Sequence, residues 1–110
     1  MSMVIHAYES EHFLTESIAD IEIPSSHLEE IDYFFKILNL DRNLDKSKTL
    51  FSNEIVDLGL DLYDGFLSRK KITELVNNFN VVSDFDNRIK NYLEMILRKT
   101  KSEYILFSYT

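Results

Sequence analysis

Residues that break helices are scarce in this chain. Pro24 is the one proline among 110 residues, and Gly59 and Gly65 are the two glycines. Because proline and glycine most disfavour a helix interior, this scarcity favours long helices. An apolar content of 45%, with eight Phe and six Tyr, supplies the side chains for a compact core. The sequence has no internal repeat and no Pro/Gly/Ser-rich linker, so we expect a single domain over residues 1–110.

Three segments have the composition of β-strands. Residues 19–23 alternate apolar and acidic side chains, which is the period of a half-buried strand, and Pro24 ends the pattern. A helix over residues 10–21 competes with this strand, because several apolar residues there also lie near helical spacing. Residues 3–8 and 104–109 are rich in β-branched or aromatic residues. We expect the last segment to pair with an N-terminal strand in a small sheet.

Two helices are expected in the first half of the chain. Residues 27–39 repeat apolar side chains at helical spacing, and Ser26 followed by Glu29 has the sequence pattern of a capping box. Residues 40–48 are polar and charged, which indicates a loop. The second helix is predicted over residues 50–67, where both glycines would lie within the helix.

Helical periodicity also marks the second half of the chain. Apolar residues between 72 and 79 continue or restart a helix after three consecutive bases, and Ser83 is the expected N-cap of a last helix. The fold class predicted from these elements is α+β and mostly helical. Three to four helices would pack with a small sheet formed from the chain termini.

A row of four carboxylates lies in the second predicted helix, spaced three, four and three residues apart: Glu54, Asp57, Asp61 and Asp64. On a helix turning 100° per residue, this spacing places them in one narrow stripe. Like charges at such spacing repel by a few tenths of a kcal/mol per pair. A solvated polar face and a contact face for a cationic partner both fit the stripe, and the second reading would explain why the repulsion is tolerated.

The negative charge is concentrated in one part of the chain. The formal net charge is −7. Residues 1–64 carry fourteen Asp and Glu against four Lys and Arg, a balance of −10, whereas residues 65–110 carry five acids and eight bases, a balance of +3. Such a chain repels nucleic acids and anionic membranes over most of its surface and attracts cationic partners.

Several functional classes find no support in the residues. The chain has no cysteine for a disulfide or thiolate site, and no run of about 20 apolar residues that could span a membrane. The N-terminus lacks the pattern of a secretory signal, so a cytoplasmic protein is expected. His6, His12 and His27 do not have the spacing of a local zinc pair. With no phosphate-binding glycine loop and no nucleophile elbow, we expect a non-enzymatic protein without metal or cofactor.

Nucleic-acid binding has one supporting feature, a concentration of bases toward the C-terminus: Arg69, Lys70, Lys71, Arg88, Lys90, Arg98, Lys99 and Lys101. Two helices joined near residues 80–83 could even mimic a helix-turn-helix. Phosphate contacts dominate the affinity of such proteins, however, and the strongly acidic first half opposes approach to phosphates. A nucleic-acid partner is therefore disfavoured.

The remaining class is protein binding. Nuclease clefts are cationic because they bind phosphates, so an acidic domain of this size suits an inhibitor or immunity-type protein that neutralises a basic nuclease toxin. This comparison rests on size and charge alone. Two acidic patches and two aromatic anchors form the predicted partner-binding site: Glu54, Asp57, Asp61 and Asp64; Glu29, Glu30 and Asp32; Tyr33 and Tyr63.

Self-association is the alternative function. The acidic first half and the basic last helix are complementary, so two copies could dock as a symmetric homodimer. Such a structural or regulatory module would dissociate as salt is added, whereas an inhibitor would remain a monomer at all salt concentrations.

Overall fold

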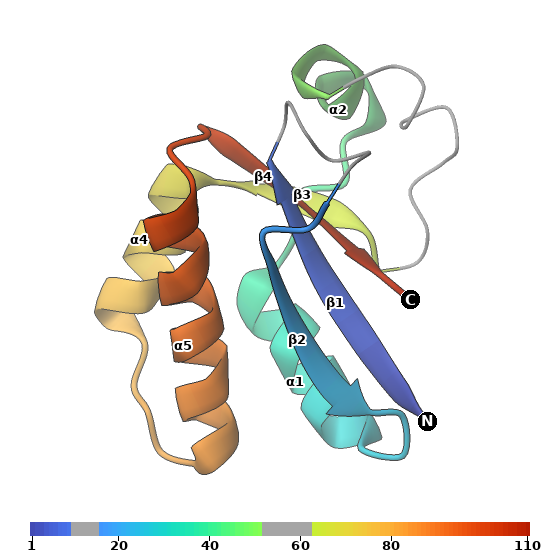
Figure 1. The fold of residues 1–110 in the computed structure, drawn as a ribbon, viewed down its shortest axis with the longest axis vertical. Coiled ribbons are helices and arrows are strands. Elements are labelled where there is room, and N and C mark those ends of the chain that lie inside the picture. Colours follow the sequence, from blue (N-terminus) through green and yellow to red (C-terminus); the bar gives the residue numbers. More distant parts are fainter. Residues whose placement is uncertain (10–15, 52–62) are drawn as a thin grey trace.

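A computed structural model of the chain describes residues 1–9, 16–51 and 63–110. These residues form four helices and four strands, which confirms the predicted α+β class. The strands are β1 (Ser2–Glu9), β2 (Ala19–Pro24), β3 (Gly65–Ser68) and β4 (Tyr104–Tyr109). The helices are α1 (Leu28–Leu38), α2 (Leu44–Leu50), α4 (Arg69–Asn78) and α5 (Asp84–Lys99). Figure 1 shows three of these helices, α1, α4 and α5, gathered beside the sheet, with α2 apart from them.

The sheet joins the two ends of the chain. Its strand order is β2-β1-β4-β3, and every neighbouring pair is antiparallel. The central β1 pairs with β2 so that Ile5 faces Ile21, and it pairs with β4 so that Ala7 faces Phe107. The predicted pairing of the last strand with an N-terminal strand is therefore confirmed. The alternation of residues 19–23 is also observed, because their apolar side chains are buried and their acidic ones are exposed.

One face of the sheet carries the main core. Alternate residues of β1, β2 and β4 point into a single cluster with the apolar faces of α1, α4 and α5. The largest fully buried members of this cluster are Phe34, Phe107, Ile5, Ile23, Leu38, Ile72, Ile89, Leu93, Ile96 and Ile105. Burying an apolar side chain of this size stabilises a fold by about 1.5–3 kcal/mol, so this face supplies most of the hydrophobic free energy.

The opposite face is divided between an apolar and a polar half. Phe51, Phe66 and Leu106 form a second buried cluster over β3 and β4, where residues next to α2 cover the sheet. Over β1 and β2 the same face carries His6 and Asp20. The sheet thus has its continuous apolar surface on the side of α1, α4 and α5.

Other parts of the chain contact both edges of the sheet. Beyond β3, Asp41 and Phe66 exchange two backbone hydrogen bonds of 2.9 Å. Beyond β2, the Arg88 guanidinium donates to the Glu22 carbonyl oxygen at 2.5 Å. Pro24, two residues after Glu22 on β2, has its backbone nitrogen on the same outer side of the sheet, and a proline has no N–H to donate.

The helix predicted over residues 50–67 is wrong at its C-terminal end. Gly65–Ser68 is the strand β3, and Leu50 ends α2, while residues 52–62 lie outside the described residues. A short apolar run such as Phe66 and Leu67 satisfies a strand as well as a helix, and pairing with β4 decides the outcome. Gly65 suits the strand because the Cβ of another residue there would lie 2.7 Å from the Leu40 Cβ.

Two further expectations about helix starts are corrected. The loop predicted over residues 40–48 contains the start of α2, which begins where the Asn43 side chain accepts a hydrogen bond from the Lys46 N–H. The capping box predicted at Ser26 is absent, because α1 has His27 as its N-cap and no side-chain cap hydrogen bond. Ser26 lies in the turn in which the His27 N–H donates to the Pro24 carbonyl.

The termini of α5 are secured by side chains. Ser83 is the N-cap as predicted, and it forms a capping box with Asp86. At the other end, the Arg69 guanidinium donates to the carbonyls of Thr100 at 2.6 Å and Leu97 at 3.0 Å. These bonds satisfy carbonyls that a helix end leaves without partners. The positive charge of Arg69 also interacts favourably with the negative C-terminal end of the helix dipole.

The close approach at Gly65 yields a stability prediction. Gly65→Ala should lower the free energy of unfolding by about 1 to 3 kcal/mol, because the added methyl group has to displace the Leu40 side chain or the Asp41 carbonyl. Denaturant unfolding measures the change. The matched control is Asn77→Ala on the exposed face of α4, where alanine should be neutral or stabilising. Equal stability of Gly65→Ala and the parent would contradict the described contact.

Candidate protein-binding site

The predicted acidic stripe is only partly within the described structure. Glu54, Asp57 and Asp61 lie outside the described residues. Asp64 is 9% exposed and precedes β3, so it is not part of a helical row there. Its backbone oxygen accepts a hydrogen bond of 2.8 Å from the Arg42 side chain. Asp64 therefore supplies a buried carboxylate beside the sheet rather than an exposed one on a helix.

Tyr63, one of the two predicted aromatic anchors, packs within the protein. Its ring stacks on Phe35 with centroids 4.6 Å apart and meets the edge of Tyr109 at 5.5 Å. These contacts bridge the residues before β3 to α1 and β4. The ring thus has a structural role whether or not its remaining surface meets a partner.

The second predicted patch lines a hollow between two helices. Glu29, Glu30 and Tyr33 of α1 face the segment that starts α5, and together they enclose an open hollow of about 550 Å³. The residues contributed by the α5 side are Val82, Ser83, Asp84, Phe85 and Asp86. Asp32 is exposed on α1 but does not line this space. We refer to this feature as the α1–α5 hollow.

The floor of the α1–α5 hollow is held by one buried carboxylate. Asp86, 4% exposed, accepts hydrogen bonds from the Tyr33 hydroxyl at 2.5 Å and from the backbone N–H groups of Val82 and Ser83. The bond from Tyr33 joins α1 directly to the first turn of α5. The bond lowers the pKa of Asp86, because it stabilises the charged carboxylate. It raises the pKa of Tyr33, because it stabilises the protonated hydroxyl.

The other carboxylates of the hollow lie toward solvent. Glu29 and Asp84 are exposed, while Glu30 accepts a 2.5 Å contact from the His27 ring. All of them belong to the first turn of α1 or α5, where the helix dipole favours negative charge. Helix electrostatics therefore accounts for the presence of acids at each helix start, but not for the two starts meeting at one hollow.

Exposed apolar side chains accompany these carboxylates. Val82 is 81% exposed, Leu28 is 67% exposed and Tyr33 is 41% exposed. Val82 and Tyr33 line the hollow, and Leu28 immediately precedes its first residue. A helix dipole gives no reason for this apolar exposure. An apolar patch rimmed by charge is a common feature of protein-binding surfaces.

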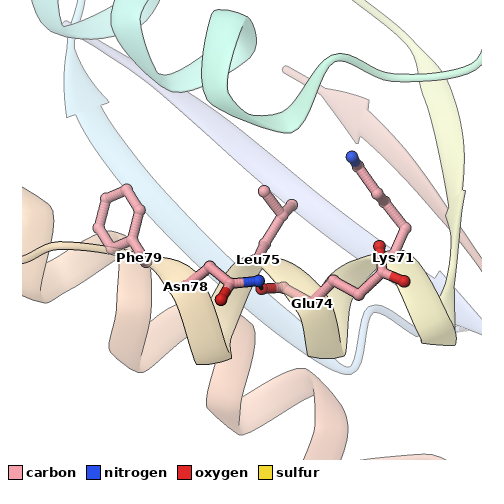
Figure 2. A pocket seen from close by; sticks show the side chains of 5 residues that line it. All are labelled: Lys71, Glu74, Leu75, Asn78 and Phe79. Atoms are coloured by element: carbon pink, nitrogen blue, oxygen red, sulfur yellow. Dashed lines mark hydrogen bonds between the residues drawn. The ribbon is translucent and has the colours of Figure 1, made fainter.

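A second hollow, of about 280 Å³, lies along α4. Figure 2 shows its lining side chains on α4 and at the Phe79 C-cap, with Leu75, Phe79 and Lys71 projecting to the same side. Leu75 and Phe79 also pack against the main core. One acid, Glu74, and one base, Lys71, give this surface no net charge that would select a partner. It is therefore a weaker candidate than the α1–α5 hollow.

A chain of polar side chains crosses the outer face of the sheet. His6 Nδ1 lies 2.8 Å from Asp20 Oδ1, and His6 Nε2 lies 2.9 Å from Thr110 Oγ1. The order resembles a hydroxyl-activating triad, yet these residues line none of the hollows described here. Burial would raise the pKa of Asp20, but hydrogen bonds from Ser17 and His6 lower it overall. We assign this chain of contacts to cross-strand stabilisation.

Two of the bases considered for nucleic-acid binding are engaged within the protein. Arg69 caps α5, and Arg88 bonds the edge of β2 and lies 6.0 Å from the Phe85 ring centroid. Among the described residues, no three acidic or histidine side chains are placed to hold a metal ion. In the same part of the chain, no helix combines the length and apolar character needed to cross a membrane.

Comparison with protein-family models, with curated proteins and with solved structures returns no match to this chain. Function is therefore inferred from the residues and geometry described above. The sequence identified the α1 side of the hollow but missed Val82, Asp84 and Asp86 as its opposite wall. Ser83 did identify a helix start there, although nothing local to it indicates that α1 lies alongside.

The bond between Tyr33 and Asp86 yields a pH-dependent prediction. Tyr33→Phe should lower the free energy of unfolding at pH 7, because it removes a donor to a buried carboxylate. Asp86 has a lowered pKa, so its stabilisation is complete above its unfolded pKa of about 3.9 and is lost as the pH falls through the folded value. The difference between variant and parent should therefore shrink in acid.

Denaturant unfolding at pH 7 and at successive acidic pH values measures this difference. Tyr63→Phe is the matched control, since it removes a hydroxyl from a ring whose described contacts are aromatic. A Tyr33→Phe variant as stable as the parent at pH 7 would contradict the assigned bond.

Proposed function

We propose that this chain is a non-enzymatic acidic protein-binding domain, an inhibitor or immunity-type protein that neutralises a basic partner such as a nuclease toxin. The observation that supports this most is the α1–α5 hollow, where exposed carboxylates and exposed apolar side chains meet. The net charge of −7 supports it further. A chain without cysteines needs no oxidising compartment, so we propose the cytoplasm as its place of action.

Charge complementarity gives the proposed inhibitor its speed and selectivity. A nuclease cleft is lined by Lys and Arg that bind phosphates, and surface carboxylates are the protein groups that replace phosphates there. Opposite potentials raise the association rate and disfavour partners of the wrong sign. Glu29 and Asp84, both exposed at the hollow, are the described carboxylates that we assign to this role.

Apolar contacts give the proposed complex its lifetime. A few buried aromatic or aliphatic side chains usually dominate the free energy of an interface, surrounded by polar contacts that exclude water. Tyr33 and Val82 are placed for this role inside the hollow. Contact by both kinds of group distinguishes a specific binding face from a merely solvated acidic surface.

Affinity capture tests the proposal directly. The purified chain, immobilised and exposed to lysate of its native cell, should retain a basic nuclease through a low-salt wash and should inhibit that nuclease at an equimolar ratio. Retention of only acidic proteins, or of a nuclease whose activity is unchanged by the chain, would contradict the proposed function.

A charge-neutralising double variant tests the hollow within this function. Glu29→Gln combined with Asp84→Asn should slow association with the captured partner about tenfold at low ionic strength, because steering depends on these charges. Stopped-flow mixing measures the rate. Glu74→Gln combined with Glu94→Gln removes the same charge from residues that do not line the hollow, and should have a smaller effect. An equal effect of both pairs would indicate general charge attraction without a binding face.

The second candidate is a self-associating module. Arg98, Lys99 and Lys101 are exposed at the end of α5, opposite in sign to the acidic helix start of α1. Sedimentation velocity at low and high salt separates the candidates. A homodimer that dissociates as salt is added would favour self-association, and a monomer under both conditions would favour the inhibitor.

A further inference from the structure

Two exposed apolar side chains of the described residues lie beside carboxylates at one hollow. Seven large apolar residues are more than a third exposed among the described residues. Val82 and Tyr33 line the α1–α5 hollow. Leu28 and Val81 precede the lining residues Glu29 and Val82 in the sequence. Two of the seven thus line this hollow. Scattered exposure of apolar residues is ordinary, whereas apolar side chains rimmed by carboxylates at a hollow are typical of a docking surface.

We propose that the α1–α5 hollow receives an arginine side chain from a basic protein partner, together with a neighbouring apolar side chain of that partner. The inference deepens the proposed function and rests on it for the existence of a basic partner. It adds the place of contact, the preferred cation and a contribution that salt does not screen.

The carboxylates available to the arginine come from two different helices. Glu29 belongs to α1 and Asp84 to α5, and both are exposed at the hollow. Asp86 already accepts bonds from Tyr33 and two backbone N–H groups, so it holds the floor in place. A guanidinium has five N–H donors in a fixed plane, which allows it to bond carboxylates approaching from two sides.

The aromatic lining favours arginine over lysine. Tyr33 and Phe85 lie with ring centroids 6.2 Å apart, and the Tyr33 ring is 41% exposed. A planar and weakly hydrated guanidinium stacks on such a ring, whereas the compact ammonium of lysine keeps its water more strongly. The protein itself places Arg88 at 6.0 Å from the Phe85 ring centroid, so Phe85 already borders one guanidinium.

The apolar rim requires a second type of contact. Val82 lines the hollow just before α5, and at 81% exposure it is left uncovered by the residues around it. An apolar side chain next to the incoming arginine would remove this surface from water. Charge attraction weakens with ionic strength, but apolar burial does not, so part of the affinity should survive added salt.

Titration with short capped peptides, followed by NMR of the ¹⁵N-labelled protein, tests the inference. The probes are Gly-Leu-Arg-Leu-Gly, Gly-Leu-Lys-Leu-Gly and Gly-Ser-Arg-Ser-Gly, each acetylated and amidated. The first should shift amide signals of residues 28–33 and 82–86 and bind at least about threefold more tightly than the lysine peptide. It should also lose less affinity in high salt than the serine peptide.

Variants locate the two contributions. Glu29→Gln combined with Asp84→Asn should weaken the Leu-Arg-Leu peptide about tenfold. Val82→Ser should weaken it about threefold at low and high salt alike. Glu74→Gln combined with Glu94→Gln should leave the affinity within about twofold of the parent. Dispersed amide spectra of every variant establish that the fold is intact before affinities are compared.

Each result decides one point. Shifts spread over all acidic surfaces, equal binding of the arginine and lysine peptides, or absence of binding would overturn the inference. Capture of a basic partner whose affinity is unchanged by the hollow variants would overturn it as well, while leaving the proposed function intact. Peptide binding at the hollow without any basic partner in the lysate would support the arginine preference and count against the proposed function.

Discussion

Pairing between β1 and β4 is the interaction on which the rest of the structure depends. It joins residues 5–9 to residues 105–109, so the two ends of the chain become neighbouring strands at the centre of the sheet. Only this closure creates a continuous apolar surface wide enough for α1, α4 and α5 to bury their faces together. Tyr92 of α5 ties that helix to the central strand, since its buried hydroxyl donates to the Ile5 carbonyl of β1. Contacts so distant in sequence carry a large closure entropy, which the main core offsets.

The α1–α5 hollow is a consequence of how two helices rest on that sheet. Both helices start near the same end, and the bond from Tyr33 to Asp86 fixes them side by side. Each start attracts acids for its own electrostatic reasons. At the hollow the acids of both helix starts lie together, so it holds more carboxylates than either helix start supplies alone. Acids that stabilise each helix locally thereby give the hollow its negative charge.

Local patterns predicted those elements that local interactions determine. The alternation of residues 19–23 and the cap at Ser83 were sufficient, because period and capping are properties of short segments. Gly65–Ser68 was predicted incorrectly, since an apolar tetrapeptide becomes a strand only when β4 lies beside it. The site followed the same division. Glu29 and Tyr33 were proposed from charge and aromatic content, whereas Asp86 lies 53 residues from Tyr33 and its place beside them required the tertiary fold.

The contacts at both edges of the sheet restrict how this protein can associate with other proteins. Asp41 satisfies the outer side of β3, and Arg88 and Pro24 leave β2 poorly suited to extend the ladder. Recognition by strand addition, in which a ligand's main chain supplies most of the bonds, is thus disfavoured. A protein partner of the kind proposed would therefore be recognised through side chains, so its affinity would respond to single substitutions. Contacts at both sheet edges also disfavour the edge-to-edge pairing through which exposed strands aggregate.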